Sequence, residues 1–139
     1  MEHWASKLDI PYTIRWVHNT DPSLVVAVQK LVNISGMAYL CPISYLNIHE
    51  EYGPWIAFRA VVIFDDNMEL SEPNPLLHPD KSSIKPMEQA TQLALANIKD
   101  WRSWVNVRDS CNIGKVYRYS QNQILYHYTK DKSVLQQLK

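Results

Sequence analysis

Strand-like and helix-like patterns of hydrophobic and polar positions follow one another along the chain. Residues 12–17 show the alternation and the β-prone composition of a strand. Residues 44–49 also have a strand pattern, a turn sequence follows at residues 50–54, and residues 55–64 form a long, mostly apolar run. The pattern therefore predicts one early strand and a β-hairpin formed by the two later ones.

Apolar positions at helical spacing predict two longer helices. The first covers residues 21–40 and begins with Asp-Pro, where Asp can cap the helix and Pro suits the first helical position. The second covers residues 83–108, and Ser120 can cap a further helix in the C-terminal tail. Residues 65–85 are proline-rich and too long for a simple connection. The order strand, helix, hairpin, helix indicates an α+β fold in one domain, residues 1–139.

Composition narrows the classes of function. The chain has 139 residues, 46% of them hydrophobic, so it can form a real core. Lys plus Arg equals Asp plus Glu, 14 each, and the absence of a basic stretch argues against nucleic-acid binding. No apolar run approaches the roughly 18 residues that span a bilayer, and the N-terminal residues lack the pattern of a signal peptide. Two cysteines are too few for a disulfide framework, so the sequence predicts a cytoplasmic protein without a membrane partner.

The sequence contains no motif of a common metal or phosphate site. The five histidines are scattered, and no pair has metal-ligand spacing. With three glycines in total, a phosphate-cradling loop is not expected. Cys41 could act as a nucleophile only beside a helper histidine, and a buried structural thiol is the alternative interpretation. No catalytic residue is assigned.

Arginines are the best candidates for a binding site. Arg59 lies in the middle of the predicted apolar strand, where a half-buried guanidinium requires an internal carboxylate or an anionic ligand. Arg102 and Arg108 lie near the end of the second predicted helix, and arginine forks bind carboxylates with two hydrogen bonds. Converging arginines would bind a small polyanion. The alternative is that Arg108 forms a surface ion pair with Asp109 or another acid.

Several blocks of the chain resemble one protein family. Residues 48–62, IHEEYGPWIAFRAVV, resemble the pattern IHxxFGGWFAIRGVV of the cblC-type intracellular cobalamin (vitamin B12) trafficking proteins. Residues 101–104 (WRSW) and 107–109 (VRD) resemble that family's WRDW and YRD, and residues 118–120 match its RYS. The VAVQ and GMAY segments of the first predicted helix are similar to the corresponding helix of the family. The resemblance covers roughly residues 12–130.

The resemblance implies a fold and an activity. Members of the family have a nitroreductase-like (flavin reductase-like) fold, an antiparallel sheet flanked by helices. They bind cobalamin with its lower base displaced and remove the upper axial ligand, by reductive decyanation with a reduced flavin (FMN or FAD) or by transfer of an alkyl group to glutathione. They then pass the product to downstream B12-trafficking proteins. A non-catalytic cobalamin-binding chaperone or adaptor, and a nitroreductase-like flavin protein with another substrate, are the alternatives.

The resemblance also implies the residues of the site. The family's arginines that contact glutathione correspond to Arg59 and Arg108. Its cobalamin contacts fall on the first predicted helix, on the segment that follows it and on the hairpin: Val26, Ala27, Val28, Gln29, Leu40, Cys41, Asn47 and Phe58.

The chain departs from the family pattern in several places. The family has a long further segment before the first strand, so the chain is expected to lack the first strands of the sheet, as a fragment, an incomplete gene product, a shortened relative or one half of a homodimer that completes the fold in trans. Residues 40–42 (LCP) replace the family's tyrosine pair, and Pro54 replaces the second Gly of FGGW. One extra residue lies between Trp104 and Arg108, and a further family arginine near the C-terminus has no counterpart.

Overall fold

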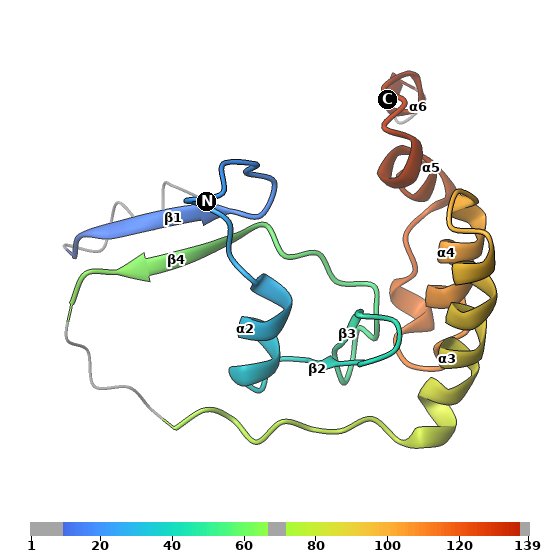
Figure 1. Cartoon of the computed structure of the whole chain (residues 1–139), viewed down its shortest axis with the longest axis horizontal. Helices are drawn as coiled ribbons and strands as arrows, with labels where there is room; N and C mark the ends of the chain where they lie inside the picture. The colour runs from blue at the N-terminus through green and yellow to red at the C-terminus, as the bar shows by residue number, and fades with distance from the viewer. Residues whose placement is uncertain (1–9, 67–71, 137–139) are drawn as a thin grey trace.

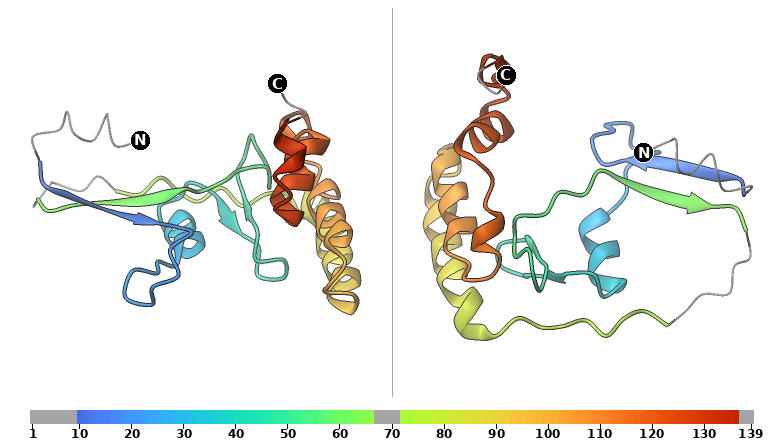
Figure 2. Two further views of the ribbon diagram at one scale, coloured as in Figure 1. Left: turned by 90° about the horizontal axis from the view of Figure 1, so that it is seen from above. Right: turned by 180° about the vertical axis from the view of Figure 1, so that it is seen from behind.

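A computed structural model gives the structure of residues 10–66 and 72–136. Figure 1 shows a two-stranded ribbon, β1–β4, on one side of the molecule and the helices α3, α4 and α5 on the other. Helix α2 and the small β2–β3 sheet lie between them, as the two further views in Figure 2 also show. Helices and small antiparallel sheets make up the chain, so the predicted α+β class is confirmed. The nitroreductase-like arrangement stays a prediction.

The ribbon consists of β1 (Tyr12–Trp16) and β4 (Ala60–Phe64), paired antiparallel. Tyr12 lies opposite Phe64 and Trp16 lies opposite Ala60. Alternate residues share a face, so Tyr12, Ile14 and Trp16 and their three partners form an entirely apolar face. No residue of either strand is buried. All six residues of this face are half-buried, and the exposed pair Thr13 and Ile63 lies on the other face. An isolated two-stranded ribbon is marginally stable in water.

The predicted hairpin over residues 44–64 is wrong. Its first half pairs elsewhere: β3 (Asn47–Ile48) is antiparallel to β2 (Tyr39–Leu40). Its second half becomes a strand only from Ala60 onward, and that strand pairs with β1. A single bridge between His49 and Gly53 remains of the expected turn region. Periodicity identifies a strand but not its partner, and here the partner of β4 lies far away in the sequence.

Both predicted long helices are shorter than expected. Helix α2 covers Val28–Ile34, and its preceding residue has no side-chain cap. The second prediction divides into α3 (Lys81–Ala96) and α4 (Trp101–Asp109). The Asp100 carboxylate accepts a hydrogen bond from the main-chain N–H of Arg102, so it caps α4 and starts a new helix within the apolar stripe.

Two clusters of buried side chains form the core. The larger joins β2–β3 to α3 and α4, and its members include Cys41, Ile48, Met87, Val107 and Cys111. The smaller contains Trp55, Val105 and Ile124 and joins α4 to α5 (Gln121–Thr129). Ser120 caps α5 in a capping box with Gln123, which confirms the predicted cap. A 3₁₀ turn, η1 (Lys115–Tyr117), precedes α5, and α6 (Ser133–Gln136) follows it.

Candidate functional site

A small pocket joins residues that are far apart in the sequence. Its volume is about 90 Å³, and it contains Gln29 of α2, Asn47 of β3, Phe58 before β4 and Arg108 of α4. All four are among the residues that the family resemblance assigns to the site. The remaining lining residues are Leu46, Pro54 and Ile56.

The Asn47 side chain carries an unpaired acceptor. The residue is 5% exposed, and its Nδ2 donates a hydrogen bond to the main-chain oxygen of Gln29 at 3.1 Å. Gln29 in turn donates through Nε2 to the main-chain oxygen of Tyr45 at 2.7 Å. Asn47 Oδ1 is buried and has no hydrogen-bond partner among the described residues. A buried, unpaired acceptor is costly, so Oδ1 is a polar atom whose hydrogen-bonding capacity the fold leaves unused.

Arg108 is held at the pocket by the chain around Trp55. Its Nη1 donates a hydrogen bond to the main-chain oxygen of Pro54, and its Cζ lies 5.9 Å from the centre of the Trp55 ring. Trp55 is itself 5% exposed. The guanidinium is half-buried, and within the described ranges it forms no ion pair with a carboxylate. The charge of Arg108 therefore remains available to an anion.

A second arginine contacts the same indole. Arg118 binds both carboxylate oxygens of Asp109, at 2.6 and 3.0 Å, and its Cζ lies 5.6 Å from the Trp55 ring centre. The hydrogen bond to Asp109 is the main cause that raises the pKa of Arg118. Asp109 thus pairs with Arg118 and not with Arg108, so the alternative of an Arg108–Asp109 surface pair is wrong.

The turn that carries Pro54 and Trp55 is fixed by two glycines. Gly53 and Gly114 have positive φ angles of 56° and 73°. A Cβ added to Gly53 would lie 2.1 Å from the main-chain oxygen of Ile113, and one added to Gly114 would lie 2.2 Å from the main chain of Tyr52. Only glycine permits this close approach of two chain segments. It places the Pro54 carbonyl next to α4.

Arg59 is exposed, which corrects the expectation of a half-buried guanidinium. The residue precedes β4, and its main-chain oxygen accepts a hydrogen bond from Val17 N at 3.0 Å. It does not line the Asn47 pocket, although its neighbour Phe58 does. Because water solvates the guanidinium, neither a carboxylate nor a ligand is required to stabilise it.

His127 is affected by both predicted glutathione arginines, and no pattern in the sequence singled it out. Its pKa is lowered, first by partial desolvation of the ring and then by the positive charges of Lys130, Arg108 and Arg59. The charges of Arg108 in α4, Lys130 just after α5 and Arg59 just before β4 therefore act on one imidazole.

The other predicted cobalamin contacts do not reach the pocket. Val26 and Val28 are half-buried and Ala27 is exposed, at the entry to α2. Leu40 is half-buried in β2, and its N–H donates to Asn33 Oδ1 at 2.8 Å. Cys41 is fully buried in the core. This burial agrees with a structural thiol, and the contact of Cys41 with cobalamin stays a prediction.

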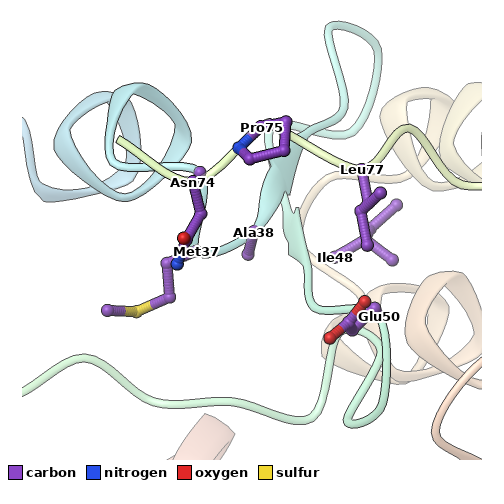
Figure 3. Close-up of a pocket in the computed structure, with 8 residues that line it drawn as sticks. Met37, Ala38, Ile48, Glu50, Asn74, Pro75 and Leu77 are labelled. Carbon is purple, nitrogen blue, oxygen red and sulfur yellow. The ribbon is translucent and has the colours of Figure 1, made fainter. Parts of the chain in front are cut away.

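Another hollow lies on the opposite side of the β2–β3 sheet. It has a volume of about 260 Å³ and is lined mainly by apolar side chains, including Met37, Ile48 and Leu77, with Glu50 and Asn74 as polar members (Figure 3). No predicted site residue lines it. Within residues 10–66 and 72–136 there is no group of three or more His, Cys, Asp and Glu side chains that could hold a metal ion. No helix of the same residues is long and apolar enough to cross a membrane.

Comparison with known proteins gives one result. The family model described as "Methylmalonic aciduria and homocystinuria type C family" matches residues 7–138, which is most of the chain. A search of the curated proteins finds no match.

Proposed function

We propose that this chain binds cobalamin with its lower base displaced and removes the upper axial ligand. The chain belongs to the methylmalonic aciduria and homocystinuria type C family and therefore has a role in cobalamin processing. The observation that carries the proposal is the unpaired Oδ1 of Asn47. Asn47 lines a pocket with Gln29, Phe58 and Arg108, which the resemblance also assigns to cobalamin and glutathione.

The size of the pocket determines how a corrin would bind. A volume of about 90 Å³ is well below the roughly 300–1,000 Å³ of an ordinary small-molecule pocket. The macrocycle therefore lies outside the pocket, and one amide arm from its rim enters. The N–H of that arm would donate to Asn47 Oδ1, and Phe58 would supply an apolar wall. These contacts hold the corrin in one orientation.

Glutathione fits the positive charge on the same side. The tripeptide carries two carboxylates, and Arg108, Arg59 and Lys130 all act on the region around His127. Its thiolate attacks the cobalt-bound carbon of an alkylcobalamin. The carbon–cobalt bond breaks, the alkyl group leaves on sulfur as a thioether, and both bonding electrons stay on cobalt as cob(I)alamin. The arginines orient the nucleophile for this step.

The described residues support dealkylation better than flavin-dependent decyanation. A reduced flavin would supply the electrons for decyanation. The Asn47 pocket, at about 90 Å³, encloses neither a corrin nor an isoalloxazine ring, so its size does not choose between the two reactions. The charge of Arg108, unpaired among the described residues, is what favours glutathione. We further propose that cob(I)alamin passes to downstream B12-trafficking proteins, and that a homodimer forms. The β1–β4 ribbon, two strands in which no residue is buried, supports the homodimer.

The test is an anaerobic incubation with methylcobalamin and glutathione. The proposal predicts loss of methylcobalamin absorbance together with one equivalent of S-methylglutathione, measured by mass spectrometry. Binding of methylcobalamin without formation of the thioether would contradict catalysis and would leave a carrier of cobalamin. An absence of binding would contradict the site itself.

A further inference from the structure

We propose that a separate hollow, between Tyr39 and the start of α3, binds a small aromatic phosphate of mononucleotide size. The hollow has a volume of about 430 Å³, within the range of about 300–1,000 Å³ typical of small-molecule pockets. It shares no lining residue with the Asn47 pocket. Tyr39 lines it, while the next residue, Leu40, pairs with Asn47. Successive strand residues point to opposite faces, so the two sites lie on opposite faces of β2–β3.

One end of the hollow is cationic. Lys81 and Lys85 both line it and lie one helical turn apart on α3, so their side chains share a face. Both are exposed, and among the described residues neither forms an ion pair. The nearby Asp80 carboxylate is already used, because it caps α3 by accepting from the N–H and hydroxyl of Ser82. Two free ammonium groups beside the N-terminus of a 16-residue helix suit a phosphate group.

The middle of the hollow is aromatic and apolar. The rings of Tyr39 and His78 lie 5.1 Å apart at an interplanar angle of 59°. Pro79 and Ile84, which is 6% exposed, complete the apolar surface. Burial is the first cause that raises the pKa of Tyr39, so its hydroxyl stays protonated and can donate a hydrogen bond. A flat ring would pack against the outer faces of this aromatic pair.

The hollow also contains a carboxylate. Glu88 lines it one helical turn after Lys85. It lies seven residues after Lys81, on the same face of α3. With a rise of about 1.5 Å per residue, the two positions are about 10 Å apart along the helix axis. This is close to the span of a mononucleotide from its phosphate to an amino group on its base. The combination of cations, aromatic rings and a carboxylate therefore favours a phosphate ester whose ring carries an amino group.

Adenosine 5′-monophosphate, adenosine and inorganic phosphate are the probes, titrated into the full chain by calorimetry at low salt. Saturable binding is expected for the nucleotide, with weaker binding of inorganic phosphate. The double variant Lys81→Gln/Lys85→Gln is expected to weaken nucleotide binding at least ten-fold and to leave adenosine binding unchanged. His78→Ala is expected to weaken both the nucleotide and adenosine. Circular dichroism confirms that each variant is folded.

The matched control is Lys30→Gln/Lys99→Gln, which removes two exposed lysines outside the hollow. The control is expected to bind the nucleotide like the unaltered chain. Equal losses in the two double variants would overturn the proposal, because they would indicate general electrostatic attraction. Failure of the nucleotide to saturate, or binding of inorganic phosphate as tight as that of the nucleotide, would overturn it as well.

Discussion

Asn47 donates its side-chain amide to the main-chain oxygen of Gln29, a residue 18 positions earlier in the chain, at 3.1 Å. This bond joins β3 to α2 and orients the amide, so its other end, Oδ1, is left buried and without a hydrogen-bond partner among the described residues. A structural contact and the proposed binding function therefore depend on the two ends of one amide.

Replacement of Asn47 tests this relationship. Asn47→Ala is expected to weaken cobalamin binding about ten-fold, because a hydrogen bond to a buried acceptor contributes about 1–1.5 kcal/mol. The measurement is a titration followed by corrin absorbance. Asn106→Ala, an exposed position on α4 outside the pocket, is the control and is expected to change the affinity less than two-fold. Equal affinity of both variants for cobalamin would show that Asn47 does not contact the corrin.

Arg108 and Arg59 are expected to contribute more to the binding of glutathione than to the binding of cobalamin. Arg108→Gln is expected to raise the KM for glutathione about ten-fold, since a charge-assisted hydrogen bond is lost, and to change corrin affinity much less. Arg59→Ala is expected to act in the same direction with a smaller effect, because its guanidinium is exposed. The matched variant Arg102→Gln removes an exposed arginine of α4 that lies over Trp101. The KM of this variant for glutathione is expected to be unchanged. A parallel loss of corrin affinity in Arg108→Gln would indicate a structural arginine.

The sequence was a good guide to residues with local roles. The alternation in residues 12–17 predicted β1, and Ser120 predicted the start of α5, because a strand pattern and a helix cap are properties of a few neighbouring residues. The family resemblance selected Gln29, Asn47 and Arg108, which the fold brings into one pocket.

Non-local contacts could not be predicted. The bond from Arg108 to the Pro54 carbonyl spans 54 residues, and it depends on the glycine-mediated approach of two loops. The exposure of Arg59 depends on which strand pairs with β4, and periodicity does not encode that choice. The influence of Arg59 and Arg108 on His127 likewise appears only after α5 is placed.

The Arg118–Asp109 ion pair is expected to contribute little to stability. Its side chains are 38% and 34% exposed, and pairs at such positions contribute up to about 1 kcal/mol. Asp109→Asn is therefore expected to lower the free energy of unfolding, measured with urea, by less than about 1 kcal/mol, and Asp66→Asn serves as an exposed control. A loss above about 2 kcal/mol would show that the pair supports the packing of Trp55.

His127 gives the chain a predicted dependence on pH. Its pKa lies below the ordinary 6.5, so the unfolded chain binds a proton at a higher pH than the folded chain. The stability contributed by neutral His127 is present above the unfolded pKa and is lost as pH falls through the folded value. His127→Gln is expected to show a smaller loss of unfolding free energy between about pH 8 and about pH 5. The same pH dependence in both proteins would contradict the assignment.

Glutathione is expected to reverse the effect of the cations on His127. Its carboxylates would offset the charges of Arg108, Arg59 and Lys130, so the pKa of His127 should rise when glutathione binds. Proton NMR of the imidazole, with and without glutathione, measures the change. A His127 pKa that does not move at saturating glutathione would place the tripeptide elsewhere.

The most direct test of the whole account is the absorbance spectrum of cyanocobalamin during titration with the protein. The account predicts conversion to the base-off spectrum with one corrin per chain, and a weaker conversion with Asn47→Ala than with Asn106→Ala. An unchanged spectrum at saturating protein would contradict it.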